Sequence, residues 1–282
     1  MTLGDHLLEG LVSVVMAAFN SEHYIAAAIQ SVLCQSYQQW ELLVVDDASS
    51  DRTPDIVAEC ARKDARIRLL RQKQNAGPAY TRNVAIKEAG GRFIAFLDSD
   101  DIWLPNKLER QITVMRESGA ALSFTAYRKI DLDGNVGDAT IEVPATVTYG
   151  QLLKTNVIAC LTAIYDSHAL GKMYMPEDMR REDYRLWLQI LKLSRHHEDY
   201  ALWLAILRKL LDKKKLQAMK VIGINEVLAY YRVHDTSVSR NKFQAAAMQW
   251  AVYRKVEGLS LWRSLYYFAH YAYRGYRKAK LR

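Results

Sequence analysis

The sequence is poor in cysteine and has no long apolar run. Its three cysteines are an odd number at wide spacing, without a Cys-x-x-Cys pair or a zinc-ligand pattern. A disulfide-stapled miniprotein is therefore excluded, and a reducing compartment is expected. The longest uninterrupted apolar stretches fall far short of the roughly 18 residues that span a bilayer. The first ten residues, MTLGDHLLEG, contain two acidic side chains and no basic segment, so we expect no signal peptide and a cytoplasmic protein.

The composition is that of a globular protein, but the charge is unevenly distributed. Half of the 282 residues are apolar and a quarter are charged, which excludes a disordered chain and fits one large domain or two small ones. Residues 242–282 hold nine Lys/Arg, one Glu and ten aromatic residues, whereas residues 1–241 hold thirty basic and thirty acidic residues. We therefore predict a neutral body followed by a basic, aromatic tail.

The first hundred residues alternate between strand and helix patterns. Apolar runs predict strands that are buried on both faces, and amphipathic segments between them predict helices. The predicted strands are 11–18, 40–45, 67–70 and 93–97, and the predicted helices are 21–35, 53–63 and 79–89. This order predicts an α/β fold with a parallel sheet, in which ligands bind beyond the carboxyl ends of the strands. Two acidic clusters, Asp46–Asp51 and Asp98–Asp101, fall at that edge.

The second half of the chain is less regular. Asp133-Gly134 predicts a hairpin between two short strands. Residues 178–220 have a helical pattern, and residues 223–239 form an extended segment. The tail has a helical pattern with Gly258 and Gly275 as its interruptions.

One internal repeat stands within the helical segment. Arg181–Lys192 (REDYRLWLQILK) and His197–Arg208 (HEDYALWLAILR) share most of their residues at an offset of 16 positions. On one continuous helix, 16 positions turn a side chain by about 160°, so the two copies would face nearly opposite ways. Unless the helix breaks near Ser194–His197, the two Glu-Asp pairs cannot serve one site.

The cluster Asp98-Ser99-Asp100-Asp101 directly follows a predicted buried strand. Three carboxylates brought together are costly to bury unless a cation neutralises them. Oxygen ligands of this kind suit Mg²⁺ or Mn²⁺ that is shared with substrate phosphates. The structural alternative is a helix N-terminus with acidic residues in its first turn, because Trp103-Leu104 begins a helical pattern.

Two further segments could bind a nucleotide. Asp46 or Asp47, at the end of the second strand, can accept a hydrogen bond from a ribose or a base, while Asp51 caps the next helix. The segment Asn75–Ala79, followed by Arg82, opens the third helix and offers an anion site, although a glycine turn with a solvated arginine explains the same residues. Neither the Gly-x-Gly-x-x-Gly fingerprint of dinucleotide folds nor a P-loop is present.

Four motifs in this order and spacing carry a resemblance to a known family. VSVVMAAFN, ELLVVDDASSDRT, NAGPAYTRNVAI and GRFIAFLDSDDIWLP resemble family 2 glycosyltransferases of the GT-A fold, and most of all the bacterial enzymes that build exopolysaccharide, O-antigen or teichuronic-type glycans. The resemblance is strong over about 11–110 and looser to about 260. It implies a GT-A catalytic domain at 1–241, with a nucleotide-sugar half at about 11–110, an acceptor half at about 111–241, and a helical extension at 242–282.

The resemblance also implies roles for individual residues. The nucleotide would be held by Ala17, Phe19, Asn20, Asp46, Asp47, Arg82, Asp98 and Ser99. A divalent cation, Mg²⁺ or Mn²⁺, would be bound on the donor diphosphate by Asp98, Asp100 and Asp101. The segment with Arg232 and His234 would close over the diphosphate. The donor would be a nucleotide-sugar, with a UDP-sugar favoured.

In such enzymes an Asp of a Glu-Asp pair at a helix start is the general base of an inverting transfer, because the acceptor hydroxyl must lose its proton on the face opposite the leaving group. Asp183, in the first copy of the repeat, is our candidate because MPEDMRREDY before it fits the family. Asp199, in the second copy, lies nearer to GINEV and remains the alternative. The insertion near 193–220 has no family counterpart, and it could perturb the active site.

The tail and the overall activity leave alternatives open. The acceptor implied by the family is a glycan or a polyprenyl-linked sugar, so we expect residues 242–282 to bind an anionic membrane surface, and the enzyme to lie peripherally on the inner face of the plasma membrane. Nucleic acid is not an expected partner, and a plain packed helical subdomain is the simpler explanation of the tail. A sugar nucleotidyltransferase is the alternative enzyme, although MAAFNSEHYI lacks the glycine of its loop. A non-catalytic basic membrane- or nucleic-acid-binding protein is the other alternative.

Overall fold

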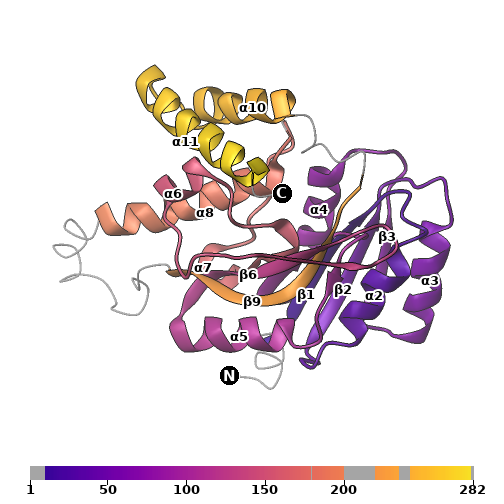
Figure 1. Ribbon diagram of the computed structural model, residues 1–282. Coiled ribbons are helices and arrows are strands. Elements are labelled where there is room, and N and C mark those ends of the chain that lie inside the picture. The colour runs from indigo at the N-terminus through magenta and orange to yellow at the C-terminus, as the bar shows by residue number, and fades with distance from the viewer. Residues whose placement is uncertain (1–9, 179, 200–219, 235–241, 281–282) are drawn as a thin grey trace.

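The computed structural model describes residues 10–178, 180–199, 220–234 and 242–280. One curved sheet runs through the molecule, with helices on both of its faces (Figure 1). The strands follow the order β3-β2-β1-β4-β8-β6-β9-β5, and β7 pairs with β6. The arrangement is the α/β sheet that the sequence predicts.

The N-terminal half of the sheet is parallel. Its strands are β1 (Val12–Ala18), β2 (Trp40–Asp46), β3 (Ile67–Arg71) and β4 (Phe93–Phe96). All of their mutual pairings are parallel, so their carboxyl ends meet at one edge. The apolar runs that predict these strands are continuous because β1, β2 and β4 are covered by helices on both faces.

The second half of the sheet is mixed. It comprises β5 (Ile102–Trp103), β6 (Ala120–Ile130), β7 (Val136–Ile141), β8 (Ile164–Asp166) and β9 (Lys220–Arg232). β8 joins the two halves through antiparallel pairings with β4 and β6. β9 runs parallel to β6 and brings its last residues to the edge where β1, β2 and β4 end. The predicted hairpin is confirmed at β6–β7, where Gly134 has a φ of 90°.

Two apolar cores lie on opposite faces of the sheet. On one face pack α2 (Ile25–Leu33), α3 (Thr53–Lys63) and α5 (Lys107–Ser118). On the other pack α4 (Pro78–Glu88), α6 (Tyr149–Lys154) and α8 (Glu182–Asp199), while the short α7 (Ser167–Leu170) follows β8. Neighbouring residues of β1 and β2 point alternately into the two cores, as the pleat of a strand requires.

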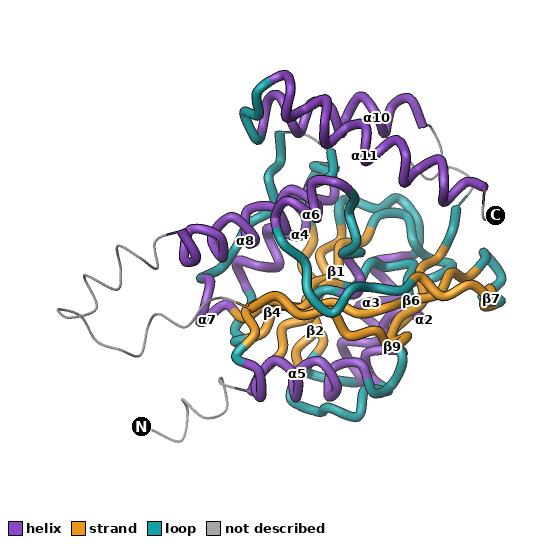
Figure 2. The backbone as a smooth tube through the Cα atoms, turned by 60° about the vertical axis from the view of Figure 1, so that its left-hand side comes forward, coloured by secondary structure: helices purple, strands orange, loops and turns teal. Residues whose placement is uncertain are grey.

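The tail folds onto the body as a helical layer. α10 (Lys242–Ala251) continues through a π-helical turn, and α11 (Leu261–Lys280) runs back across it above α6 and α8 (Figure 2). Val252 and Tyr253 of the π-helical turn are fully buried in the core beneath. Gly258, with a φ of 60°, separates the two helices as predicted, whereas the prediction of an interruption at Gly275 is wrong, because α11 continues through it.

Candidate active site

A cleft of about 650 Å³ opens where β1, β2 and β4 end. It collects segments that lie far apart in the chain: the loops after these three strands, the start of α4 and the end of β9. The residues that line it are Ala17, Ala18, Phe19, Asn20, Ser21, Tyr24, Asp47, Asn75, Gly77, Pro78, Thr81, Arg82, Asp98, Ser99, Asp100, Tyr231 and His234. Most of the residues that the resemblance assigns to the nucleotide therefore lie on one surface.

Arg82 connects a carboxylate of the cleft to the helix that begins with the Glu-Asp pair. Its guanidinium donates to Asp98 Oδ1 at 2.5 Å and to Glu182 Oε1 at 3.0 Å. Arg82 is only 8% exposed, and the charges of Asp98 and Glu182 raise the pKa of its guanidinium against the effect of burial. One side chain of α4 thus joins the loop after β4 to the start of α8, across a hundred positions of sequence.

The other two aspartates of the cluster are held by the end of β9. His234 Nε2 lies 2.8 Å from Asp100 Oδ2, and the backbone N–H of Arg232 donates to Asp101 Oδ1 at 2.7 Å. Burial and the neighbouring carboxylates raise the pKa of both aspartates, and the effect is largest at Asp101. The cluster is a set of crowded carboxyls in which a bound cation would favour the charged forms.

The alternative explanation of the cluster as a helix N-terminus is wrong. α5 begins only at Lys107, and Ile102–Trp103 forms the strand β5, which pairs with β9. The aspartates therefore have no helix first turn to cap.

The carboxylates of the cluster match the ligands of a hard cation only in part. Asp98 and Asp100 line the cleft, whereas Asp101 is only 1% exposed and lies behind it. Its Oδ2 is buried without a hydrogen-bond partner in the described part of the chain. Across residues 10–178, 180–199, 220–234 and 242–280, no group of three His, Cys, Asp or Glu side chains is gathered closely enough to hold a metal. Two carboxylates facing a cleft nevertheless match Mg²⁺ or Mn²⁺, which complete their coordination with water and phosphate oxygens.

The Asp46-Asp47 pair divides into a lining residue and a buried one. Asp47 lines the cleft and accepts hydrogen bonds from the backbone N–H groups of Ala76 and Gly77, at 2.8 and 2.9 Å. It thereby fixes the loop before α4, where Gly77 has a φ of 85°. Asp46 is fully buried and does not line the cleft. Of the pair, only Asp47 therefore lines the cleft.

Asp183 lies in the first turn of α8, next to Glu182. Burial and, after it, the charge of Glu182 raise the pKa of the Asp183 carboxyl to about 6. A carboxyl with such a pKa accepts a proton more readily than an ordinary aspartate at neutral pH, which suits a general base.

The helix that carries both Glu-Asp pairs does not break. α8 is continuous from Glu182 to Asp199, so Asp199 lies about 24 Å along the axis from Asp183 and nearly on the opposite side. The side chain of Asp199 and the rest of the second copy lie outside the described residues. The two aspartates therefore cannot act at the same point.

Arg232 lies behind the cleft instead of lining it. Its guanidinium donates to the carbonyl oxygens of Asp100, Asp131 and Leu132 at 2.7–3.0 Å and is stacked over the Tyr24 ring, 4.7 Å from its centroid. It fixes the shape of the aspartate loop. His234 does line the cleft, beside Tyr24 at a ring-centroid distance of 5.4 Å.

Sequence reasoning missed three participants. Ser21 forms a hydrogen bond with Ser99 at 2.8 Å, Tyr24 packs on His234 and Arg232, and Glu182 binds Arg82. Only Glu182 had a sequence signal, since it is half of the Glu-Asp pair. The other two lie in a segment that reads as an ordinary helix start.

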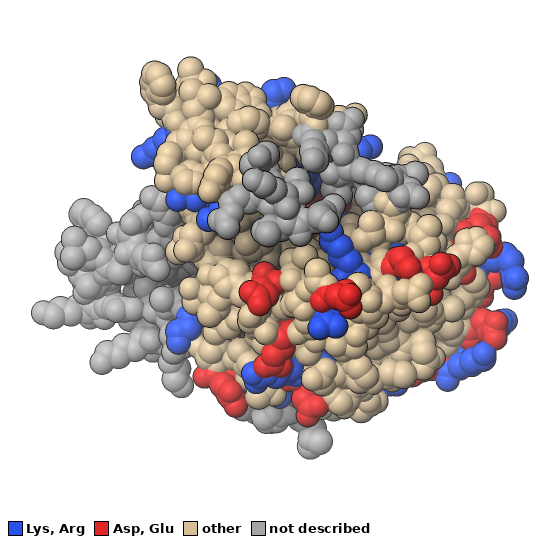
Figure 3. Space-filling view, in the orientation of Figure 1, with Lys and Arg blue, Asp and Glu red and all other residues tan. Residues whose placement is uncertain are grey.

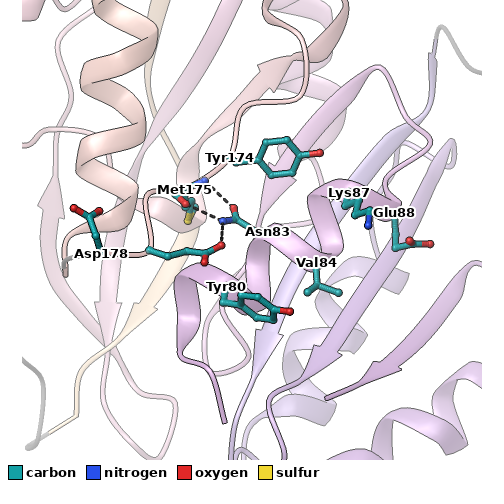
Figure 4. Close-up of a pocket in the computed structure, with 9 residues that line it drawn as sticks. Tyr80, Asn83, Val84, Lys87, Glu88, Tyr174, Met175 and Asp178 are labelled. Atoms are coloured by element: carbon teal, nitrogen blue, oxygen red, sulfur yellow. Dashed lines mark hydrogen bonds between the residues drawn. The ribbon is translucent and has the colours of Figure 1, made fainter. Parts of the chain in front are cut away.

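A second hollow of about 700 Å³ lies on the outer side of α4 (Figure 4). Tyr80 and Tyr174 flank it, and the amide of Asn83 holds the segment 172–178 through the backbone of Met175 and the carboxylate of Glu177. The hollow does not include the aspartates. Its contacts fix the segment that leads into α8.

The comparisons with known proteins agree with this arrangement. Residues 13–171 match the model of the family described as Glycosyl transferase family 2. The chain belongs to this family. Its members are transferases, so the comparisons leave the nucleotidyltransferase and the non-catalytic alternatives without support.

Two relatives align over nearly the whole chain. TuaG of Bacillus subtilis (strain 168), whose name places it in teichuronic acid biosynthesis as a glycosyltransferase, is 37% identical over 93% of this chain and 94% of its own. WfgD of Escherichia coli, named a UDP-Glc:alpha-D-GlcNAc-diphosphoundecaprenol beta-1,3-glucosyltransferase, is 39% identical over 95% of this chain and 94% of its own. This glycosyltransferase therefore resembles full-length relatives as well as the family domain.

A solved structure confirms the fold. The mannosyltransferase PcManGT from Pyrobaculum calidifontis, in complex with GDP-Man and Mn²⁺, superposes with a TM-score of 0.62 over 93% of this chain and 69% of its own, at 15% identity. The protein has the GT-A fold that the sequence motifs predict.

Proposed function

We propose that this glycosyltransferase moves a sugar, with inversion, from a UDP-sugar to a polyprenyl-linked glycan acceptor in cell-surface polysaccharide synthesis. The observation that carries the proposal is the bridge made by Arg82. It ties Asp98, on the donor side, to Glu182, the neighbour of Asp183, at 2.5 and 3.0 Å. Arg82 thereby connects a carboxylate that lines the cleft to the helical turn that carries the candidate base, although Asp183 itself is not among the residues that line the cleft.

The donor would lie along the loops after β1, β2 and β4. Asp47, Asn20 and Phe19 would contact the nucleoside, and Asp98, Ser99 and Arg82 would lie at the diphosphate. WfgD is named for a UDP-Glc donor, which supports a UDP-sugar here. His234, which lines the cleft beside Asp100, would close over the diphosphate, while Arg232 shapes the loop from behind.

The cation would be held by Asp98 and Asp100 and would be Mg²⁺ or Mn²⁺. PcManGT is described with Mn²⁺, and the hard oxygen donors of this cleft fit either ion. When bound, the cation offsets the negative charge that builds on the leaving diphosphate. Asp101, buried behind the cleft, would support the loop without binding the ion directly.

Asp183 would act as the general base. Its carboxylate would take the proton from an acceptor hydroxyl as that oxygen forms a bond to the anomeric carbon, while the bond from that carbon to the diphosphate breaks on the opposite face. The pKa of about 6 keeps the group ionised at neutral pH and strong enough to accept a proton. Glu182 would hold Arg82 in place.

The tail would bind the enzyme to the inner face of the plasma membrane. Among the described helices, none combines the length and apolar character needed to cross a bilayer. α11, however, presents an exposed apolar stripe, with Trp262 78% and Tyr273 60% exposed. The stripe consists of Trp262, Leu265, Tyr266, Ala269 and Tyr273, which share a sector of about 100° on the helix.

Exposed basic residues lie beyond one edge of this stripe. Arg263 and Arg274 are exposed next to it, and on the face shown in Figure 3 the region of α10 and α11 carries basic and uncharged side chains while the acidic ones lie on the body. An exposed apolar stripe with bases along one edge is an arrangement that suits an interfacial helix on anionic lipid. WfgD is named for a diphosphoundecaprenol-linked acceptor, which is a membrane substrate.

A ligand screen tests the proposal. Thermal denaturation with UDP, GDP and CMP, each with and without Mn²⁺, is followed by turnover of UDP-sugars with a GlcNAc-diphospho-lipid acceptor. We expect UDP to stabilise the protein only with Mn²⁺, and EDTA to stop turnover. Full activity in EDTA would contradict the cation, and preferential stabilisation by GDP or CMP would contradict the UDP donor.

A further inference from the structure

A single side chain of α10 holds both residues that flank the Glu182–Asp183 pair. The guanidinium of Arg181 donates to Gln249 Oε1, and Gln249 Nε2 donates to the hydroxyl of Tyr184 at 3.0 Å. Gln249 is 2% exposed and Tyr184 is 1% exposed. Both functional groups of one buried amide are therefore committed to the first turn of α8.

Other helices hold the same turn. The Arg181 guanidinium lies over the Tyr184 ring at 5.6 Å and over the Tyr271 ring of α11 at 5.7 Å from the centroids. The Tyr184 hydroxyl donates in turn to the carbonyl oxygen of Leu152 on α6, at 3.3 Å. The start of α8 is thus fixed from α6, α10 and α11, the last two of which belong to the tail.

The backbone at this turn needs such support. Arg181 has a φ of 69°, which is rare for a residue other than glycine. Its carbonyl oxygen accepts the first helical hydrogen bond, from the N–H of Arg185 at 3.0 Å, so it occupies the place that Ser, Thr, Asp or Asn usually fills. A strained residue of this kind persists only where surrounding contacts fix it. Here those contacts come from Gln249 and Tyr271.

We infer that Gln249 is a positioning residue for Asp183, acting through Arg181 and Tyr184, so that the tail supports the reaction as well as the membrane contact. The inference rests on the proposed role of Asp183 as the base. Near the reacting atoms, a displacement of about 1 Å lowers a rate on the order of 100-fold. Loss of the Gln249 contacts is therefore expected to lower kcat without weakening donor binding.

Three variants of α10 separate positioning from folding. Gln249→Leu replaces the amide with an apolar group of comparable size and removes both hydrogen bonds. Gln249→Glu keeps the acceptor for Arg181 and offers the Tyr184 hydroxyl an acceptor in place of the amide donor, so that this hydroxyl can donate to the new carboxylate instead of to Leu152, and the variant serves as the rescue. Gln244→Leu makes the same change at an exposed glutamine of the same helix.

The assay measures release of UDP from UDP-glucose with a GlcNAc-diphospho-lipid acceptor. We expect Gln249→Leu to lower kcat on the order of 10- to 100-fold with the donor KM unchanged, Gln249→Glu to recover most of kcat, and Gln244→Leu to match wild type. The fall of kcat at low pH should also move to lower pH in Gln249→Leu, because a released turn lets water reach the Asp183 carboxyl.

Amide hydrogen exchange gives a second measurement that needs no substrate. Faster exchange at residues 182–186 in Gln249→Leu, with an unchanged melting temperature, supports the inference. Wild-type kcat and wild-type exchange in Gln249→Leu overturn it, as does an equal fall in kcat and donor affinity. If Asp183→Asn retains activity, the proposed role of Asp183 as the base is wrong. If Asp183→Asn is inactive and Gln249→Leu behaves as wild type, only the positioning role of Gln249 is wrong.

Discussion

Among single residues, Arg82 joins more of the site than any of the acidic residues that dominate the sequence pattern. It is nearly buried, and it bonds to Asp98 and Glu182 at the same time. A planar guanidinium can bridge two carboxylates in fixed directions, whereas an ammonium group acts as a point charge. The relative placement of the loop after β4 and the start of α8 therefore depends on an arginine at this position.

Substitution of Arg82 tests that dependence. Arg82→Lys should lower kcat at least about tenfold, because lysine cannot hold both carboxylates in one geometry. Arg82→Met should also destabilise the fold, by about 3–5 kcal/mol, since it leaves two carboxylates facing each other without their cation. Steady-state kinetics and chemical denaturation measure the two effects. Wild-type kcat in Arg82→Lys would contradict the bridge.

Under the proposed mechanism, the ionisation of Asp183 sets the pH dependence of transfer. A base works when it is ionised, and burial together with Glu182 raises the pKa of this carboxyl to about 6. At saturating donor, kcat should be level above that pH and fall about tenfold for each unit below it. Initial rates between pH 5 and 8, with donor saturation checked at each pH, provide the measurement. A flat profile over this range would exclude Asp183 as the base.

At the scale of elements, what could be predicted from the sequence depends on how local the signal is. The strands β1, β2 and β4 are readable because each is a continuous apolar run buried on both faces. The prediction of a helix that begins at Trp103-Leu104 is wrong. Leu104 precedes Pro105, which disfavours helical backbone at Leu104. Ile102–Trp103 instead forms a strand, and its partner β9 is more than a hundred positions away in the sequence.

The site also contains residues that local motifs predict and contacts that they do not. Asp98, Asp100, Asp47 and Arg82 could be proposed from motifs, because each follows a strand or opens a helix. Their partners Glu182, His234 and Tyr24 come from distant segments that the sheet brings together. Periodicity within a window carries no information about such pairs. That Asp101 is buried behind the cleft also depends on the approach of β9.

The continuity of α8 separates the two Glu-Asp pairs. Because the helix runs unbroken from Glu182 to Asp199, the second aspartate is about 24 Å along the axis from the first. Asp199→Asn should leave kcat and donor KM within about twofold of wild type, as a change far from the reacting atoms does. Steady-state kinetics on the purified variant test this. An inactive Asp199→Asn would move the base to the second copy.

At the scale of the whole molecule, the neutral body and the basic helical layer meet at α8, and we propose a separate task for each. One face of α11 packs inward, with Ser264 fully buried and Tyr267 and Phe268 against Tyr253 and Trp250. The other face carries the apolar stripe. The layer is therefore both a packed subdomain and a candidate membrane surface.

Vesicle binding tests the outward face. The protein should co-sediment with anionic vesicles, bind neutral vesicles less and be released by salt. The reason is that each Lys or Arg near an anionic surface contributes about 1 kcal/mol of electrostatic binding free energy. The double substitution Trp262→Ser with Tyr273→Ser should reduce binding, whereas Val136→Ser, at an exposed position of β7, should not. Tight, salt-sensitive binding to DNA with no binding to vesicles would contradict the membrane assignment of the tail and favour nucleic acid as its partner.

The most direct test of the account is transfer by Asp183→Asn compared with wild type, with UDP binding measured on both. Asparagine keeps the shape of the side chain and cannot accept the proton, so kcat should fall on the order of 10²- to 10⁴-fold. UDP affinity with Mn²⁺ should stay unchanged, and the variant should melt at or above the wild-type temperature at pH 7, since a carboxyl with a raised pKa destabilises the fold when ionised. Transfer at the wild-type rate by a folded, UDP-binding Asp183→Asn would contradict the account.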